Sequence, residues 1–157
     1  MSDNGDNYEA IELTSSGGQT CIGTWIHHND VSGIKNTSGS PNAVGVKMYN
    51  NGLAIIEDNY FHDCKGGIYD KASGIVANQP AGFHDVTYRR NYFANNGYDL
   101  TGPLQAASQQ AVLKIYDNVF ASGGGLNLGH DQTGSQVYNN LFLGQMAGDG
   151  FDYLHGT

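Results

Sequence analysis

Six similar segments of the sequence carry, at one matching position, side chains that could contact a ligand. This position holds Glu12, Lys47, Tyr69, Asp99, Asn127 and Asp152. Two residues further on, the matching position holds Thr14, Tyr49, Lys71, Thr101, Gly129 and Leu154, with His130 and His155 one residue beyond. Tyrosine rings can stack on pyranose faces, while lysine, aspartate and asparagine can hydrogen-bond hydroxyls or carboxylates. A shared face made of these positions would suit an extended sugar chain. The alternative is a solvated face with ordinary cross-strand pairs.

These segments belong to a repeat that predicts short strands joined by a bend. The repeat is centred on Asn29, Asn59, Asn91, Asn118 and Asn140, which are 22 to 32 residues apart. Three residues before each asparagine stand Ile26, Ile56, Tyr88, Ile115 and Val137, and two residues after it stand Val31, Phe61, Phe93, Phe120 and Phe142. Apolar positions that alternate with polar ones are typical of strands, and asparagine favours the bend between them.

The segments with the candidate contact residues form a third strand in each repeat. Their first apolar column holds Ile11, Val46, Ile68, Tyr98, Leu126 and Phe151, and their second holds Leu13, Met48, Asp70, Leu100, Leu128 and Tyr153. An inward Asp70 is costly unless it is paired, hydrogen-bonded or bound to a cation, or unless a bulge turns it outward.

Three short strands in each repeat, without a helix between them, exclude a βαβ sheet and predict an all-β solenoid. We expect about six coils stacked in parallel, with the asparagines bonded to one another as a ladder. Residues 10–157 would form this single domain, and residues 1–9 would be a polar N-terminal segment or a partial cap.

With this repeat, the chain resembles the right-handed parallel β-helix proteins of the pectate-lyase-like superfamily over residues 10–155, and it would be a short or truncated member. The strings that carry the resemblance are WIHHNDV, IIEDNYF, TYRRNYF, IYDNVF and VYNNLF, together with glycine-led strings such as GVKMYNN and GIYDKAS. The resemblance implies a right-handed parallel β-helix. It does not select a function, because the superfamily includes polysaccharide lyases, hydrolases, epimerases, phage tailspikes and adhesins.

The resemblance also implies that the glycine-led strand lines the cleft, where a lyase or epimerase would abstract a proton from an acidic sugar. Such a reaction needs a base, an acid and a partner for the substrate carboxylate. Lys71 could be the base, Tyr69 or His130 the acid, and Lys47 the carboxylate partner. The substrate would be contacted by Lys47, Tyr49, Asp99, Asn127 and Asp152. Ca²⁺, if bound, would be held by Asp70 and Asp99. The alternative for Lys71 is an ion pair with Asp70 or Asp99, and the alternative function is a non-catalytic structural, adhesive or glycan-binding module.

The two arginines are predicted to be structural. Arg89 and Arg90 occupy, one coil later, the positions of Glu57 and Asp58. Opposite charges at equivalent positions of adjacent coils are typical of charge ladders that fix the register of neighbouring strands.

The histidines and cysteines give no metal pattern. His27 and His28 are adjacent in a strand, which predicts rings on opposite sides and argues against a shared metal. His62 and His84 show no partner pattern and are interpreted as surface or loop residues. The cysteines, Cys21 and Cys64, are far apart and are interpreted as small buried hydrophobic residues.

Composition and charge exclude several classes of protein. The 157 residues include 23 glycines, which disfavour a helical bundle, and their formal net charge of −8 disfavours nucleic acid or an anionic membrane as partner. Residues 1–7 are polar and acidic and show no apolar segment of a signal peptide. We expect an extracellular or periplasmic protein whose partner is an acidic or neutral polysaccharide, with end-to-end or side-by-side self-association as a further expectation.

Overall fold

The computed structural model describes residues 8–13, 22–37, 42–48, 53–70, 84–102, 111–128, 134–143 and 151–153, and its regular elements are all strands. Sheet I contains β1 (Tyr8–Leu13), β4 (Ala43–Met48), β7 (Gly66–Asp70), β10 (Tyr98–Gly102), β13 (Leu126–Leu128) and β16 (Phe151–Tyr153). Sheet II contains β2 (Thr24–His27), β5 (Leu53–Glu57), β8 (His84–Arg89), β11 (Ala111–Tyr116) and β14 (Gln136–Tyr138). Sheet III contains β3 (Asp30–Ser32), β6 (Tyr60–His62), β9 (Tyr92–Ala94), β12 (Val119–Ser122) and β15 (Leu141–Phe142).

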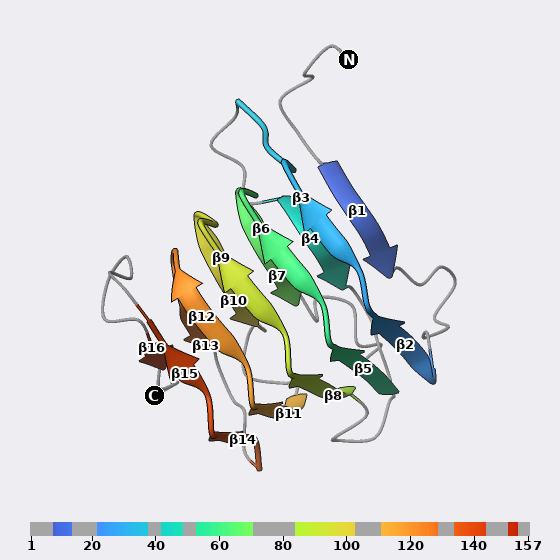
Figure 1. Ribbon diagram of the computed structural model, residues 1–157. Coiled ribbons are helices and arrows are strands. Elements are labelled where there is room, and N and C mark those ends of the chain that lie inside the picture. Colours follow the sequence, from blue (N-terminus) through green and yellow to red (C-terminus); the bar gives the residue numbers. More distant parts are fainter. Residues whose placement is uncertain are drawn as a thin grey trace.

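In the described residues, five successive coils each contribute one strand to every sheet, β16 adds a sixth strand to sheet I, and the coils stack in chain order (Figure 1). All paired strands are parallel, for example β5 with β8 and β4 with β7. Parallel strands in one sheet lie about 4.8 Å apart, so each coil advances the solenoid by this distance. The predicted all-β parallel solenoid is confirmed. Within the described ranges, no helix is long and apolar enough to cross a membrane.

The bend from sheet II to sheet III repeats in five coils and contains the predicted asparagine ladder. The residue before each asparagine has a positive φ of 52° to 56°, in His28, Asp58, Arg90, Asp117 and Asn139. The Nδ2 of each asparagine donates to the Oδ1 of the asparagine in the next coil, at 2.9 to 3.0 Å, from Asn29 through Asn59, Asn91 and Asn118 to Asn140. These bonds satisfy side chains that would otherwise be buried without partners, and they fix one bend over another.

The core consists of apolar columns that run along the solenoid axis. Phe61, Phe93, Phe120 and Phe142 stack with ring centroids 5.5, 5.0 and 4.8 Å apart. Ile56 and Ile115 of sheet II and Ile68 of sheet I are fully buried beside this stack. Cys64 is also buried, as predicted, whereas Cys21 lies outside the described residues.

The predicted apolar columns of sheet I are wrong at β10 by two residues. Leu100, not Tyr98, pairs with Ile68, and Tyr98 pairs with Gly66. The reason lies in the preceding corner. Ala94 is aligned with His62, and from there both coils use the same number of residues to reach sheet I. The ring of Tyr98 takes the space above Gly66, since a Cβ there would lie 2.2 Å from Cζ of Tyr98.

Candidate functional site

The residues predicted to line the outer face of sheet I are only partly brought together. The register aligns Glu12, Lys47, Tyr69, Thr101, Asn127 and Asp152 in one column. The prediction that Asp99 belongs to this column is wrong, because the shifted register of β10 puts Thr101 there instead. Tyr49, Lys71 and His130 lie outside the described residues, so their proposed roles stay predictions.

Two central residues of this column are not displayed on the surface. Lys47 is 1% exposed, and its Nζ donates to Oε1 of Glu9 at 2.5 Å. Tyr69 is 6% exposed, and its ring meets that of Tyr98 edge-on at 6.3 Å. A buried lysine that is paired with a carboxylate is poorly placed to neutralise the charge of a substrate. In the described residues, the outer face of sheet I therefore lacks the open stripe that the alternation of residues predicted.

Asp70 points into the solenoid and is hydrogen-bonded there. The hydroxyl of Tyr88, from sheet II, donates to Oδ2 of Asp70 at 2.6 Å. Burial, together with the neighbouring Asp70 carboxylate, raises the pKa of Tyr88 well above its usual range, so the phenol keeps its proton. Of the ways to accommodate an inward Asp70 that the sequence left open, the structure uses a hydrogen bond.

Asp99 is buried at the corner between sheets III and I. Its Oδ1 accepts a bond from Nδ2 of Asn96 at 3.0 Å, and its Oδ2 accepts one from the backbone N–H of Gly125 at 2.9 Å. Burial raises the pKa of Asp99 to about 6. The register puts Asp99 opposite Gly67, which lies three residues before Asp70 in β7. Asp99 and Asp70 are therefore offset by about 10 Å along the strand direction. The two predicted calcium ligands are therefore not brought into one site, and no group of three or more His, Cys, Asp or Glu gathers in the parts of the chain described here.

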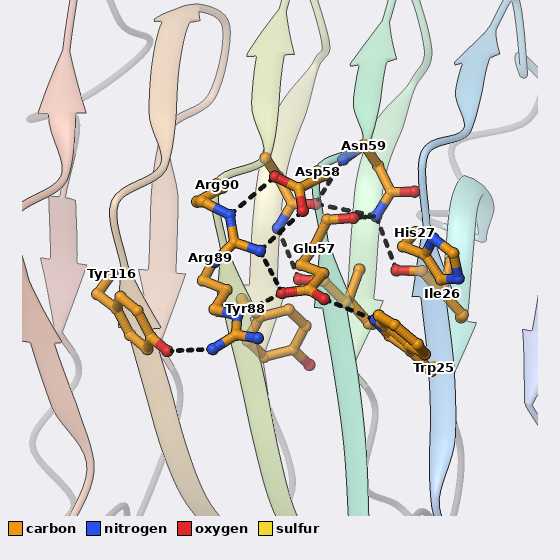
Figure 2. A network of polar contacts seen from close by, with 12 residues as sticks. Trp25, Ile26, His27, Glu57, Asp58, Asn59, Tyr88, Arg89, Arg90 and Tyr116 are labelled. Carbon is orange, nitrogen blue, oxygen red and sulfur yellow. Dashed lines mark hydrogen bonds and ion pairs between the residues drawn. The ribbon is translucent and has the colours of Figure 1, made fainter.

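A different set of functional groups lies on the outer face of sheet II, with Glu57 at its centre (Figure 2). The Oε1 of Glu57 accepts a bond from Nε1 of Trp25 at 2.7 Å, and its Oε2 accepts bonds from Nε of Arg89 and from Nη2 of Arg90, the latter at 2.6 Å. Asp58 accepts two bonds from Arg90, each 2.8 Å long. The bond from Arg89 is the main cause that lowers the pKa of Glu57, and the bond from Arg90 does the same for Asp58. The predicted pairs of opposite charge on adjacent coils are confirmed.

Exposed aromatic rings flank this charged centre along the coils. Trp25 is 60% exposed, and its ring lies 4.1 Å from that of His27, tilted by 33°. On the other side, Nη1 of Arg89 donates to the hydroxyl of Tyr116 at 3.0 Å, and Tyr116 stacks in parallel on Tyr138 at 4.9 Å. Tyr138 is 45% exposed. We call the outward side chains of β2, β5, β8, β11 and β14 the sheet II face.

The aromatic residues of the sheet II face were not singled out from the sequence, although their spacing was visible there. His27, Glu57, Arg89, Tyr116 and Tyr138 form one column in the register. The charged residues of this column predicted ion pairs, whereas its aromatic residues predicted no contact. Trp25 lies two residues before His27 and points to the same side of β2, as the alternation of a strand requires.

The structure corrects the prediction for His27 and His28 and adds partners for His62, whose side chain is partly exposed. His27 and His28 do not point apart, since their Nδ1 atoms lie 2.8 Å from each other. The cause is the positive φ of His28, 55°, which ends the strand and turns the second ring toward the first. His62 has partners that its sequence neighbourhood did not reveal, because its ring nitrogens lie 2.7 Å from Oδ2 of Asp63 and 3.0 Å from Oδ1 of Asp30. These carboxylates, Asp63 above all, raise the pKa of His62.

The parallel coils and their asparagine ladder, with polar and aromatic side chains on the outer faces, define a parallel β-helix protein. A family model described as a right handed beta helix region matches residues 2–142, and the chain belongs to this family. Membership in this family supports either a carbohydrate-associated protein or a structural protein, and it does not indicate a particular reaction. A search of curated proteins and a search of solved structures found no match to the chain.

Proposed function

We propose that the protein is a non-catalytic, carbohydrate-binding β-solenoid, and that an extended polysaccharide lies across the coils on the sheet II face. The observation that carries this proposal is the set of exposed rings held by the Glu57 network. Trp25 is fixed by its bond to Glu57, and Tyr116 is fixed by Arg89 on one side and Tyr138 on the other.

Rings that are held in place suit this task for two reasons. Trp and Tyr combine a flat apolar surface for the C–H face of a pyranose with polar atoms that bond hydroxyls. Rings whose rotamers are already fixed lose little conformational entropy when the sugar binds. The five coils of sheet II span about 19 Å, which is the length of a short oligosaccharide. An extracellular or periplasmic location is part of the proposal, because such polysaccharides are found there.

The lyase or epimerase hypothesis stays a prediction beside this proposal. It depends on Lys71 as base and on His130 or Tyr69 as acid. Lys71 and His130 lie outside the described residues, while Tyr69 is buried. Buried Lys47, paired with Glu9, gives the lyase hypothesis no accessible partner for a substrate carboxylate.

Calorimetric titration with oligosaccharides tests the proposal with a matched pair of variants. Tyr138 on sheet II and Tyr92 on sheet III are 45% and 42% exposed, so truncation of either costs little folding free energy. We expect Tyr138→Ala to weaken binding about tenfold, or about 1.4 kcal/mol, and Tyr92→Ala to leave it unchanged. Equal effects of the two variants, or the absence of binding to any glycan, would contradict the proposal.

The same samples separate binding from catalysis. Incubation with alginate or pectate should give no growth of the absorbance of unsaturated uronates. If that absorbance grows in the wild type and is lost in Lys71→Ala, the lyase hypothesis replaces the proposal of a non-catalytic module.

A further inference from the structure

A pocket of about 430 Å³ opens on the sheet II face, beside Trp25. Its apolar walls include Trp25, Leu53 and Ile55, which are 60%, 50% and 37% exposed. Exposed apolar side chains that gather around a concave surface mark a place where a ligand can bury them. The indole of Trp25 cannot swing freely over the pocket, because Glu57 holds its Nε1 and His27 packs against the ring.

The polar side of the pocket is formed by Asp85, Thr87 and Lys114. Nζ of Lys114 lies 3.6 Å from Oδ1 of Asp85, and the two side chains are 43% and 34% exposed. An exposed pair at this distance is worth little to stability, so both groups can turn to a ligand at small cost. Together with the hydroxyl of Thr87, they offer an acceptor, a donor and a group that is both.

The charges of the sheet II face select against an acidic ligand. Counted over the described strands of sheet II and the bend that follows each, the cations are Arg89, Arg90 and Lys114, and the anions are Glu57, Asp58, Asp85 and Asp117. Each of these cations already has a carboxylate partner. The whole chain carries a net charge of −8. A polyanion would meet no surplus of positive charge here and would be repelled by the protein as a whole.

We propose that this pocket holds two successive neutral hexopyranose units of the bound polysaccharide, one with its C–H face on Trp25 and the next with its hydroxyls on Asp85, Thr87 and Lys114. The inference rests on the proposed carbohydrate binding and adds the ligand class and a subsite to it. Asp85 accepts bonds from ring hydroxyls, Lys114 donates to hydroxyl oxygens, and Thr87 does either. A neutral sugar lets the Asp85 and Lys114 charges stay close to each other while both bond the ligand.

Trp25 makes the test specific to this pocket, because it is the only tryptophan of the chain. Its fluorescence is followed while neutral hexasaccharides (of glucose, mannose or galactose units) and acidic ones (of galacturonate or mannuronate) are added. We expect a saturable change with at least one neutral ligand and none with the acidic ones. Asp85→Asn should weaken the neutral ligand about tenfold. The matched control is Asp30→Asn on sheet III, where the carboxylate is 72% exposed and contacts His62, and it should leave the affinity unchanged.

The other results overturn the inference in distinguishable ways. If a neutral glycan binds with loss in Tyr138→Ala but with no change in Trp25 fluorescence and no effect of Asp85→Asn, the pocket is not a subsite, while the proposed function stands. If only acidic glycans bind, the assignment of a neutral ligand is wrong. If no glycan binds by calorimetry, the proposed function fails and the inference fails with it.

Discussion

The indole Nε1 of Trp25 donates a 2.7 Å hydrogen bond to Glu57 on the neighbouring coil. The same carboxylate is ion-paired with Arg89 and Arg90, so one side chain positions an exposed ring and contacts two cations. A charge-assisted network of this kind holds its members more firmly than isolated pairs do. Glu57 thereby links the register of the coils to the shape of the proposed binding surface.

Replacement of Glu57 by glutamine should weaken glycan binding. The amide oxygen can still accept one bond, but the negative charge that holds Arg89 and Arg90 is lost, and Arg89 in turn supports Tyr116. We expect affinity to fall about tenfold in calorimetric titration. Asp58→Asn is the control, because Asp58 bonds Arg90 and has no hydrogen bond to Trp25 among its described contacts. A loss of the same size in the control would show that the effect is one of general charge.

The asparagine ladder should be most sensitive in its middle. Asn91 accepts bonds from the backbone N–H and Nδ2 of Asn59 and donates to the carbonyl of Ile56, all in a buried environment. Asn91→Ala leaves these groups without partners and should lower the free energy of unfolding by about 3 kcal/mol. Asn29→Ala, at a partly exposed position of the first bend, should cost about 1 kcal/mol. Urea denaturation measures both values, and equal losses would argue against the ladder as a source of stability.

Asp99 should make stability depend on pH. Burial raises its pKa from 3.8 to about 6 in the folded state, so between these values the folded chain binds more protons than the unfolded chain. The contribution of Asp99 to the free energy of unfolding therefore decreases as the pH rises from about 3.8 to about 6, by up to about 3 kcal/mol. Asp99→Asn lacks this titration. The difference in unfolding free energy between wild type and variant should fall across that window, whereas parallel pH profiles would refute the assignment.

Gly67 should not tolerate a side chain. A Cβ at this position would lie 2.5 Å from the carbonyl oxygen of Asp99 and 2.8 Å from Cδ1 of Phe93. Gly67→Ala should therefore destabilise the protein by about 1 to 3 kcal/mol. At Gly102, in the neighbouring strand, the nearest atoms would lie at 3.4 and 3.7 Å, so Gly102→Ala serves as the tolerated control. Thermal unfolding of both variants checks the contrast, which would fail if Gly67→Ala unfolded at the wild-type temperature.

The features that sequence alone predicted correctly are those in which each coil repeats a local pattern. Asn59 and Asn91, like Phe61 and Phe93, occupy the same place relative to the bend, so their stacking follows from the repeat. The charge pairs on adjacent coils follow for the same reason. The position of such a residue can be predicted by counting from the nearest bend, without knowledge of distant parts of the chain.

The failures have three physical causes. The position of Asp99 depends on the number of residues in a corner, which the glycine-led strings did not show. The burial of Lys47 and Tyr69 depends on long-range packing, which strand alternation cannot report. The contact between His27 and His28 depends on a left-handed backbone conformation at His28, and such a conformation is uncommon for residues other than glycine.

The central claim is that a polysaccharide binds across the coils on the sheet II face, and backbone amide chemical shifts test it most directly. A saturating neutral hexasaccharide is added to isotope-labelled protein, and the shift changes are mapped on the three sheets. The largest changes are expected on β2, β5, β8, β11 and β14, around Trp25, Arg89 and Tyr138. The largest changes on β4, β7 and β10 of sheet I, around Lys47 and Tyr69, would contradict the claim.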